Sequence, residues 1–303
     1  MPRVGNEAVK APLAFCVVND RMISCDAPFV PMLQSEAAAR ALRLLGRDAR
    51  LRTLPCGTRA VTVRCALPLG VGLRMTTRGP IFAATACDDS RADAIRALGL
   101  HLVNAPDETF GTALRATGFR RVMTPATVAL LPTRATLPEQ LGLACPEWRG
   151  AARQGLESAA GLSMRRFVPS RDRWLLDRER LQQGTKGYRA ADADLALALT
   201  QSAPEDVWIA MAELHGRPIA GMLFVRHETG ATYHVGWTGA EGRRLRAHPA
   251  LLALAATRLH AAGVRWIELG TLDTERLAGL ARFKLGTGAR AQRLGGTWIR
   301  LPI

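Results

Sequence analysis

The chain has 303 residues, of which 48% are hydrophobic and 22% are charged. This composition is typical of a folded globular protein with a substantial core, and the length favours two domains. No apolar run approaches the ~20 residues of a membrane-spanning helix, and the N-terminus lacks the apolar region of a signal peptide. We therefore expect a cytoplasmic protein without a membrane span.

The formal net charge is +15, from 41 basic and 26 acidic residues. Such an excess indicates a polyanionic partner such as RNA, DNA or a phosphorylated substrate. Only three basic residues are lysines, namely Lys10, Lys186 and Lys284. Because a lysine offers a compact point charge and an arginine a planar fork, a lysine kept in an arginine-rich chain marks a candidate functional position.

The six cysteines show no C-x-x-C spacing, so the sequence predicts neither a disulfide framework nor a metal site. We expect them to be small buried apolar residues. They are Cys16, Cys25, Cys56, Cys65, Cys87 and Cys145.

The first half alternates predicted strands and helices. Ser35 is a suitable N-cap for a helix that Gly46 ends, and short β-rich runs follow between glycines and prolines. In chain order we expect a strand at 11–18, a helix at 34–46, strands at 49–54, 60–67 and 73–77, a helix at 88–98, a strand at 100–103, a helix at 108–116 and a long strand at 119–131.

The second half begins after a proline-containing segment, 132–145, that we interpret as a linker. Three strands at its centre are joined by tight connections and predict a meander. We expect helices at 147–160, 172–183 and 190–201, strands at 207–214, 218–226 and 231–237, a helix at 249–262 with proline in its first turn, a strand at 264–269, a helix at 275–283 and a closing strand at 289–299.

The ends of the two halves resemble each other. Each contains, in order, a glycine, a strand, an acidic loop, a helix, a glycine and a strand. This order predicts a duplicated α/β unit, although α/β units share this arrangement in general.

Polar and special residues are densest between 233 and 288. The turn that carries Arg243 and Arg246 leads to a helix start near His248, where backbone N–H groups and arginines favour an anion. The alternative is a solvated basic loop. Tyr233 and His234 alternate on the preceding strand, so one of them is a candidate pocket residue.

Asp273 and Glu275 lie just beyond a buried strand, at the end of the sheet where ligands usually bind. They are suited either to orienting an amine or to capping a helix. Lys284 lies at the C-terminal end of the last predicted helix, where a lysine also interacts favourably with the helix dipole. The corresponding place in the first half has no lysine. Trp237 is expected to lie in the core or to contact substrate.

The run Phe283-Lys284-Leu285-Gly286-Thr287-Gly288, after a strand that ends at Leu269-Gly270, resembles the C-terminal signature of the Fem aminoacyltransferase family. Shorter pieces match in order along nearly the whole chain: 33–35, 78–80, 186–189 and 233–237. The resemblance implies an α/β fold of two tandem GNAT-like domains, each a mixed, mostly antiparallel sheet with helices on both faces. The domains are expected at 1–135 and 136–303, with the active site in the second.

The resemblance further implies transfer of an aminoacyl group from aminoacyl-tRNA to an amine of a peptide or peptidoglycan precursor, without a cofactor or metal. Phe283 and Lys284 match the aromatic and lysine that stabilise the reacting ester, and an ammonium suits a tetrahedral oxyanion. Asp273 completes the candidate catalytic set. Tyr233, His234, Trp237, Arg243, Arg246, His248 and Glu275 are the candidate substrate-binding residues. The chain departs from better-known members at His248-Pro249, where those have an asparagine and an aromatic residue.

Two other functions remain open at this point. An acetyl-CoA- or acyl-CoA-dependent N-acyltransferase normally holds the CoA pyrophosphate on a glycine-rich turn, and residues 243–248 contain no glycine. An RNA-binding module without catalysis would use the arginine excess, but aromatic residues are only 5% of the chain.

Overall fold

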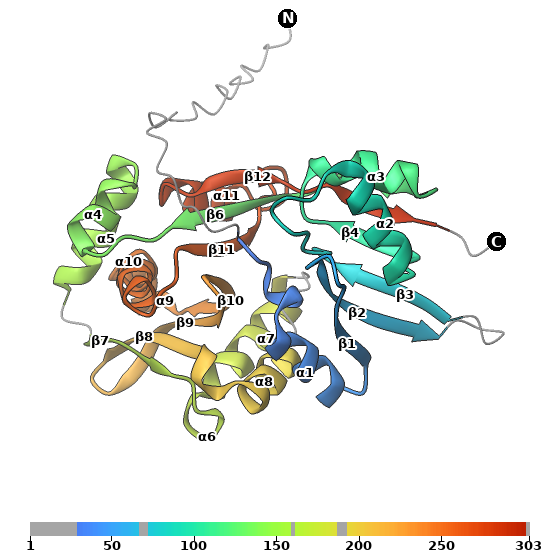
Figure 1. The fold of residues 1–303 in the computed structure, drawn as a ribbon. Helices are drawn as coiled ribbons and strands as arrows, with labels where there is room; N and C mark the ends of the chain where they lie inside the picture. The colour runs from blue at the N-terminus through green and yellow to red at the C-terminus, as the bar shows by residue number, and fades with distance from the viewer. Residues whose placement is uncertain (1–28, 67–71, 159–160, 187–192, 301–303) are drawn as a thin grey trace, which may run out of the picture.

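The structure is a computed structural model that describes residues 29–66, 72–158, 161–186 and 193–300. These residues form two β-sheets with helices packed on them (Figure 1). The predicted strand at 11–18 lies outside the described residues. The fold class predicted from the sequence is confirmed, since both sheets are mixed, mostly antiparallel and covered by helices.

The first sheet has six strands in the order β1-β2-β3-β4-β13-β5, and only the β3 and β4 pair is parallel. The three strands predicted at its start are confirmed within one or two residues. The bounds are β1 Asp48–Thr53, β2 Arg59–Ala66, β3 Gly72–Thr77, β4 Leu102–Ala105, β5 Arg120–Met123 and β13 Gly296–Ile299.

The second sheet has seven strands in the order β12-β6-β11-β10-β9-β8-β7, and only β10 and β11 run parallel. The predicted meander is confirmed as β8, β9 and β10. The bounds are β6 Thr127–Pro132, β7 Gly161–Arg166, β8 Val207–Leu214, β9 Arg217–His227, β10 Gly230–Thr238, β11 Trp266–Thr271 and β12 Arg290–Arg293.

Helices cover both faces of the second sheet. One core lies between the sheet and α4 (Leu137–Gly142), α5 (Pro146–Glu157) and α10 (Ala247–Ala261). A second core lies on the opposite face, below α7 (Trp174–Lys186), α8 (Ala193–Ser202) and α1 (Glu36–Leu44). A third core joins the first sheet to α2 (Asp88–Leu98) and α3 (Gly111–Ala116). The remaining helical elements are η1 Met32–Gln34, η3 Glu108–Phe110, α6 Pro169–Asp172, η4 Pro204–Asp206, α9 Ala240–Arg244 and α11 Ala278–Gly286.

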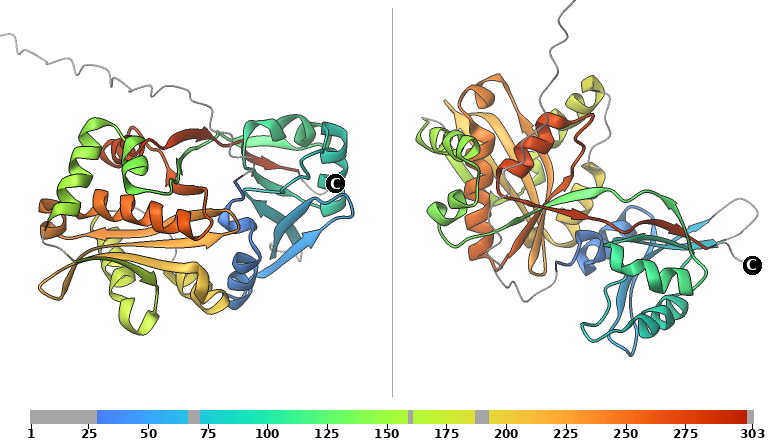
Figure 2. Two further views of the ribbon diagram at one scale, coloured as in Figure 1. Left: turned by 60° about the vertical axis from the view of Figure 1, so that its left-hand side comes forward. Right: turned by 90° about the horizontal axis from the view of Figure 1, so that it is seen from above.

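The duplicated unit is visible at the ends of the two halves, but the sequence prediction of one long final strand in each is wrong. Residues 119–131 form β5 and β6, and residues 289–299 form β12 and β13. In each pair the two strands lie in different sheets, so β6 joins the second sheet and β13 the first. Figure 2 shows the red C-terminal ribbon running from one unit to the other. The break between β5 and β6 contains Pro125, which has no N–H to donate to a ladder. The break between β12 and β13 ends at Gly296, whose φ of +83° is not that of a strand. A division at residue 135 therefore does not separate the sheets.

The linker prediction for 132–145 is also wrong, because this segment contains α4. Thr136 and Glu139 form a capping box in which each side chain accepts a hydrogen bond from the other residue's backbone. Strand β7 and helix α9 were not predicted. At the first helix the prediction is confirmed: the Ser35 hydroxyl accepts a hydrogen bond from the Ala38 N–H at 3.1 Å.

Two of the cysteines contradict the prediction of burial, since Cys56 and Cys87 are exposed. Cys65 and Cys145 are partly buried, and all four have free thiols. Cys16 and Cys25 lie outside the described residues. No helix within the described ranges is long and apolar enough to cross a membrane.

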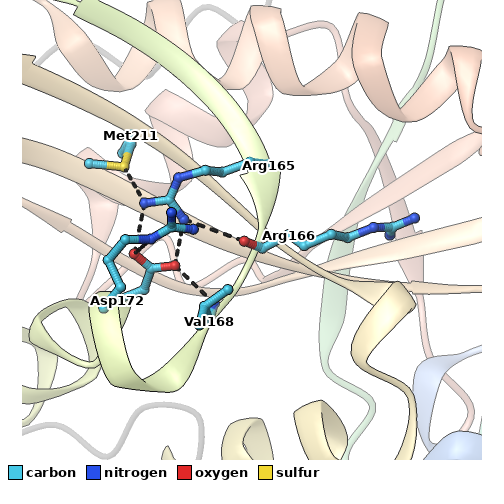
Figure 3. A network of polar contacts seen from close by, with 6 residues as sticks. Arg165, Arg166, Val168, Asp172 and Met211 are labelled. Carbon is cyan, nitrogen blue, oxygen red and sulfur yellow. Dashed lines mark hydrogen bonds and ion pairs between the residues drawn. The ribbon is translucent and has the colours of Figure 1, made fainter.

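A buried carboxylate organises the turn between β7 and α6 (Figure 3). Asp172 is fully buried and accepts hydrogen bonds from the Arg165 guanidinium and, at 2.9 Å, from the Val168 N–H. Burial alone would raise the pKa of Asp172, but the bonds from Arg165 and Val168 outweigh it and hold the pKa below its ordinary value. The carboxylate therefore stays charged and fixes the start of the α6 and α7 segment.

Candidate active site

The two parallel strands of the second sheet separate towards their carboxyl ends. β10 and β11 pair only at Gly230 to Thr232 and Trp266 to Glu268, although β10 continues to Thr238 and β11 to Thr271. Beyond these three residue pairs, no ladder joins the two strands. In an open sheet, the carboxyl ends of parallel strands are the usual ligand site, so this separation defines the candidate active site.

A β-bulge on β10 aims Tyr233 at this region. The register with β9 shifts between Tyr233 and Val235, which leaves His234 as the extra residue. Tyr233 packs on Phe224 in the core under α10, while Val235 packs in the core under α7. A Cβ on Gly236 would overlap the Tyr233 hydroxyl, so only glycine allows this tyrosine conformation.

Lys284 lies on α11 with its ammonium under the end of β11. Only 6% of the residue's surface is exposed, and Nζ donates a hydrogen bond to the Thr271 carbonyl at 2.8 Å. A Cβ on Gly270 would lie 3.5 Å from Nζ. Burial lowers the pKa of Lys284 from 10.5 to about 8, and the negative charge of Glu268 partly opposes this.

An ion pair between the units supports β11 from the other side. Arg78, in the loop after β3, donates to the Glu268 carboxylate on β11 at 2.8 Å, and both side chains are largely buried. The backbone N–H of Arg78 in turn donates to the Asn104 carbonyl at 2.7 Å. Sequence reasoning did not identify this pair as part of the site, because the partners are 190 residues apart. The sequence offered two separate signals, the matching piece at 78–80 and the lone glutamate inside the apolar strand at 266–269, but nothing that joined them.

Aromatic side chains gather around Phe283, which precedes Lys284 in the sequence. The Phe283 ring lies 6.1 Å from the Trp148 ring and 6.4 Å from the His248 ring, measured between centroids. His248 Nε2 is 2.9 Å from the Trp237 carbonyl, so this nitrogen carries the proton that it donates. Burial lowers the pKa of His248 to about 4, and the ring is neutral at pH 7.

The Trp237 side chain points away from this aromatic group. Its ring packs against Trp174 at 5.9 Å between centroids, and the Arg178 guanidinium lies 5.3 Å from its centroid. The tryptophan thus contributes its carbonyl to the position of His248, while its indole belongs to the core under α7.

The basic turn between β10 and α10 is exposed. Arg243 donates to the Thr238 carbonyl at 2.8 Å, and Arg244 pairs with Glu241. Arg246 precedes α10 in a left-handed conformation with a φ of +53°. Pro249 in the first turn of the helix has no N–H, so this helix start offers one donor fewer to an anion.

The acidic residues after β11 form a local turn. One oxygen of Asp273 accepts hydrogen bonds from the N–H groups of Glu275 and Arg276 at 3.1 and 2.8 Å, and Glu275 is exposed. These hydrogen bonds are those of a residue that caps a turn, which is the structural alternative for Asp273. In the described part of the chain, no group of three or more His, Cys, Asp or Glu residues is arranged to hold a metal ion.

Comparisons with known proteins identify a matching domain family and similar folds. Residues 149–285 match the family model described as an acetyltransferase (GNAT) domain. The fold is similar to that of FemX, with 14% identity and a TM-score of 0.73 over 89% of this chain and 92% of that one. It is also similar to the C-terminal domain of an Agrobacterium fabrum protein assigned as a lysylphosphatidylglycerol synthetase (15% identity, TM-score 0.58, 89% and 88% covered). L-PGS from Bacillus licheniformis is similar at 13% identity and a TM-score of 0.54 (86% of each chain).

No curated protein matches the sequence. The family match nevertheless shows a GNAT-type domain at residues 149–285. The two units with exchanged strands together form a Fem-like tandem GNAT fold.

Proposed function

We propose that the chain transfers an aminoacyl group from aminoacyl-tRNA to an amine of a peptide or peptidoglycan precursor and forms an amide. The observation that carries the proposal is the buried ammonium of Lys284, which lies at the carboxyl ends of the separated strands and meets a backbone carbonyl. A fixed positive charge in a dry site is suited to an anion that develops during a reaction.

The chemistry follows from this position. The neutral acceptor amine attacks the ester carbonyl, whose oxygen becomes negative in the tetrahedral intermediate. Lys284 donates a hydrogen bond to that oxygen. The intermediate then releases the ribose hydroxyl of the tRNA, which takes the proton that the amine loses. The reaction needs neither a cofactor nor a covalent enzyme intermediate, because the ester is already activated.

The aromatic neighbours have a positioning role in this proposal. Phe283 precedes Lys284 on α11 and packs between Trp148 and His248, which restricts where the lysine can point. Tyr233 and His234 border the reacting groups from β10. Arg243 and Arg246 lie on the exposed turn, where they are suited to phosphates of the donor. The FemX and L-PGS similarities support the fold of an aminoacyltransferase.

An acyl-CoA-dependent N-acyltransferase is the second candidate, and the match to an acetyltransferase (GNAT) model favours it. Two features of the helix start count against a CoA pyrophosphate. Residues 243–248 have no glycine, and Pro249 removes a backbone donor.

The test uses total tRNA charged with labelled amino acids, a library of amine-containing peptides and, in parallel, acetyl-CoA. Transfer from tRNA that is lost in Lys284→Ala supports the proposal. Transfer from acetyl-CoA alone assigns the second candidate. Salt-sensitive tRNA binding without any transfer points instead to a non-catalytic RNA-binding protein.

A further inference from the structure

An arginine-lined hollow lies on the first unit, away from the candidate active site. Its volume is about 380 Å³, and we call it the arginine hollow. It is lined by Asp48, Arg50, Leu51, Arg52, Thr62, Arg64 and Arg74. Four guanidinium groups face one carboxylate there, so the hollow carries an excess of positive charge.

Strand register explains why these arginines gather. Arg64 on β2 lies directly opposite Asp48 on β1 and opposite Arg74 on β3. Residues opposite each other in a ladder project from the same face, and so do residues two apart along a strand. Arg50 and Arg52 therefore project from the same face as Arg64 and Arg74. Three neighbouring strands present one array of arginines.

Two of the four arginines are anchored. Arg52 and Arg74 donate to the Leu98 carbonyl at 2.7 and 3.0 Å, at the C-terminal end of α2. These bonds neutralise the negative end of the helix and fix the guanidinium groups. Each guanidinium has five N–H donors, so both retain donors for a ligand.

The other two arginines are exposed. Arg50 pairs with Asp48 at 3.2 Å on the surface, and such pairs are weak and screened by salt. Arg64 has no ion pair or side-chain hydrogen bond in the described part of the chain. The hollow thus combines two fixed cations with two that can adapt to a ligand.

We propose that the arginine hollow binds phosphate groups of an RNA backbone. Its cations extend over three strands, or ~10 Å at the usual strand spacing, so one phosphate cannot contact all of them. Bidentate guanidinium contacts suit phosphate oxygens. No aromatic residue lines the hollow, so it lacks the stacking surface with which proteins hold bases. The site therefore recognises the backbone and not the base sequence.

This inference rests on the proposed function in one respect. If aminoacyl-tRNA is the donor, the hollow gives the first unit a role in holding it, while the second unit carries Lys284. RNA binding by the hollow is nevertheless measurable without transfer, and free diphosphate has the same chemistry as the RNA backbone. The experiment separates these possibilities.

The experiment measures binding of uncharged total tRNA and of inorganic pyrophosphate to the full chain at several salt concentrations. The variants are Arg64→Ala and the Arg50→Ala and Arg64→Ala double variant. Arg153→Ala is the matched control, because Arg153 is exposed on α5 and has no side-chain partner among the described residues. Arg50 and Arg64 are both exposed, so these substitutions leave the core intact.

We expect Arg64→Ala to weaken tRNA binding about five- to tenfold and to reduce the salt slope by about one, with a larger loss in the double variant. Arg153→Ala should change the affinity less than about twofold. Hollow variants that bind tRNA as tightly as the control would overturn the proposal. Loss of pyrophosphate binding with unchanged tRNA binding would also overturn it. If the wild type transfers nothing from charged tRNA while Arg64→Ala loses tRNA binding, the proposed function fails and the RNA site stands.

Discussion

Replacing Lys284 by methionine should stabilise the protein at neutral pH and abolish transfer. Methionine has a similar length and no charge, so it fills the same space under β11. The native protein holds the lysine ammonium with only 6% of the residue exposed. Burial makes the charged form costly, as the lowered pKa of about 8 reflects.

The size of the effect follows from the pKa values. The unfolded chain protonates Lys284 with a pKa near 10.5 and the folded chain with a pKa of about 8. Between these values the unfolded state binds more protons, so stability rises with pH. The burial of the charge costs about 3 kcal/mol at pH 7, and about 2 kcal/mol of this is recovered by pH 9.5.

The assay is urea unfolding of the wild type and of Lys284→Met at several values between pH 7 and 9.5. The difference between the two proteins isolates Lys284, because every other group titrates in both. We expect the wild type to gain about 2 kcal/mol relative to the variant over this range. A difference that does not change with pH would refute the reasoning, since it would mean that Lys284 titrates like an exposed lysine.

Three further changes test other parts of the structure. Transfer by the wild type should fall as pH rises through about 8, because the ammonium form of Lys284 is required. Glu268→Gln should move this fall to lower pH, since the negative charge of Glu268 raises the pKa of Lys284. A rate that increases through pH 8 would indicate a neutral lysine acting as a base. Asp172→Asn should lower the free energy of unfolding by about 2–4 kcal/mol at pH 7. Because the folded pKa of Asp172 is lowered, its contribution is present above pH ~4 and is lost as pH falls further, so unfolding curves of variant and wild type should converge in acid. Gly236→Ala should cost about 1–3 kcal/mol in thermal unfolding, and adding Tyr233→Phe should restore part of it, because the new Cβ overlaps the hydroxyl. Additive losses would show that the two side chains do not meet.

Elements that depend on local signals were predicted well. Ser35 begins α1 and Gly46 follows its end, as capping preferences require. Helix α4 carried an equally local signal in Thr136 and Glu139, but the surrounding prolines favoured a linker. Strand β7 has only a weak alternation of its own, and pairing with β8 stabilises it. Which sheet receives β6 or β13 depends on contacts far apart in sequence, so no local pattern specifies it.

In the candidate site, too, residues within a short motif could be predicted from the sequence, and contacts between distant residues could not. Lys284 and Phe283 were identified from a short motif, and the structure adds the aromatic contact with His248. Capping, the structural alternative for Asp273, matches its hydrogen bonds within the turn. The Arg78 and Glu268 pair was inaccessible to sequence reasoning, because the two residues come from different units and meet only in the folded chain.

The exchange of β6 and β13 has a consequence for how the molecule assembles and for how it can be divided. A fragment that ends at residue 135 would keep β6 without its partners and would lack β13, whose place between β4 and β5 would be vacant. The remaining fragment would keep β13 without β4 and β5, and the place of β6 between β12 and β11 would be vacant. Each half therefore completes its sheet only when the other is present, and we expect separately produced halves to behave as complementing fragments. The first unit, although it has no counterpart of Lys284, is in this sense a required cofolding partner of the second.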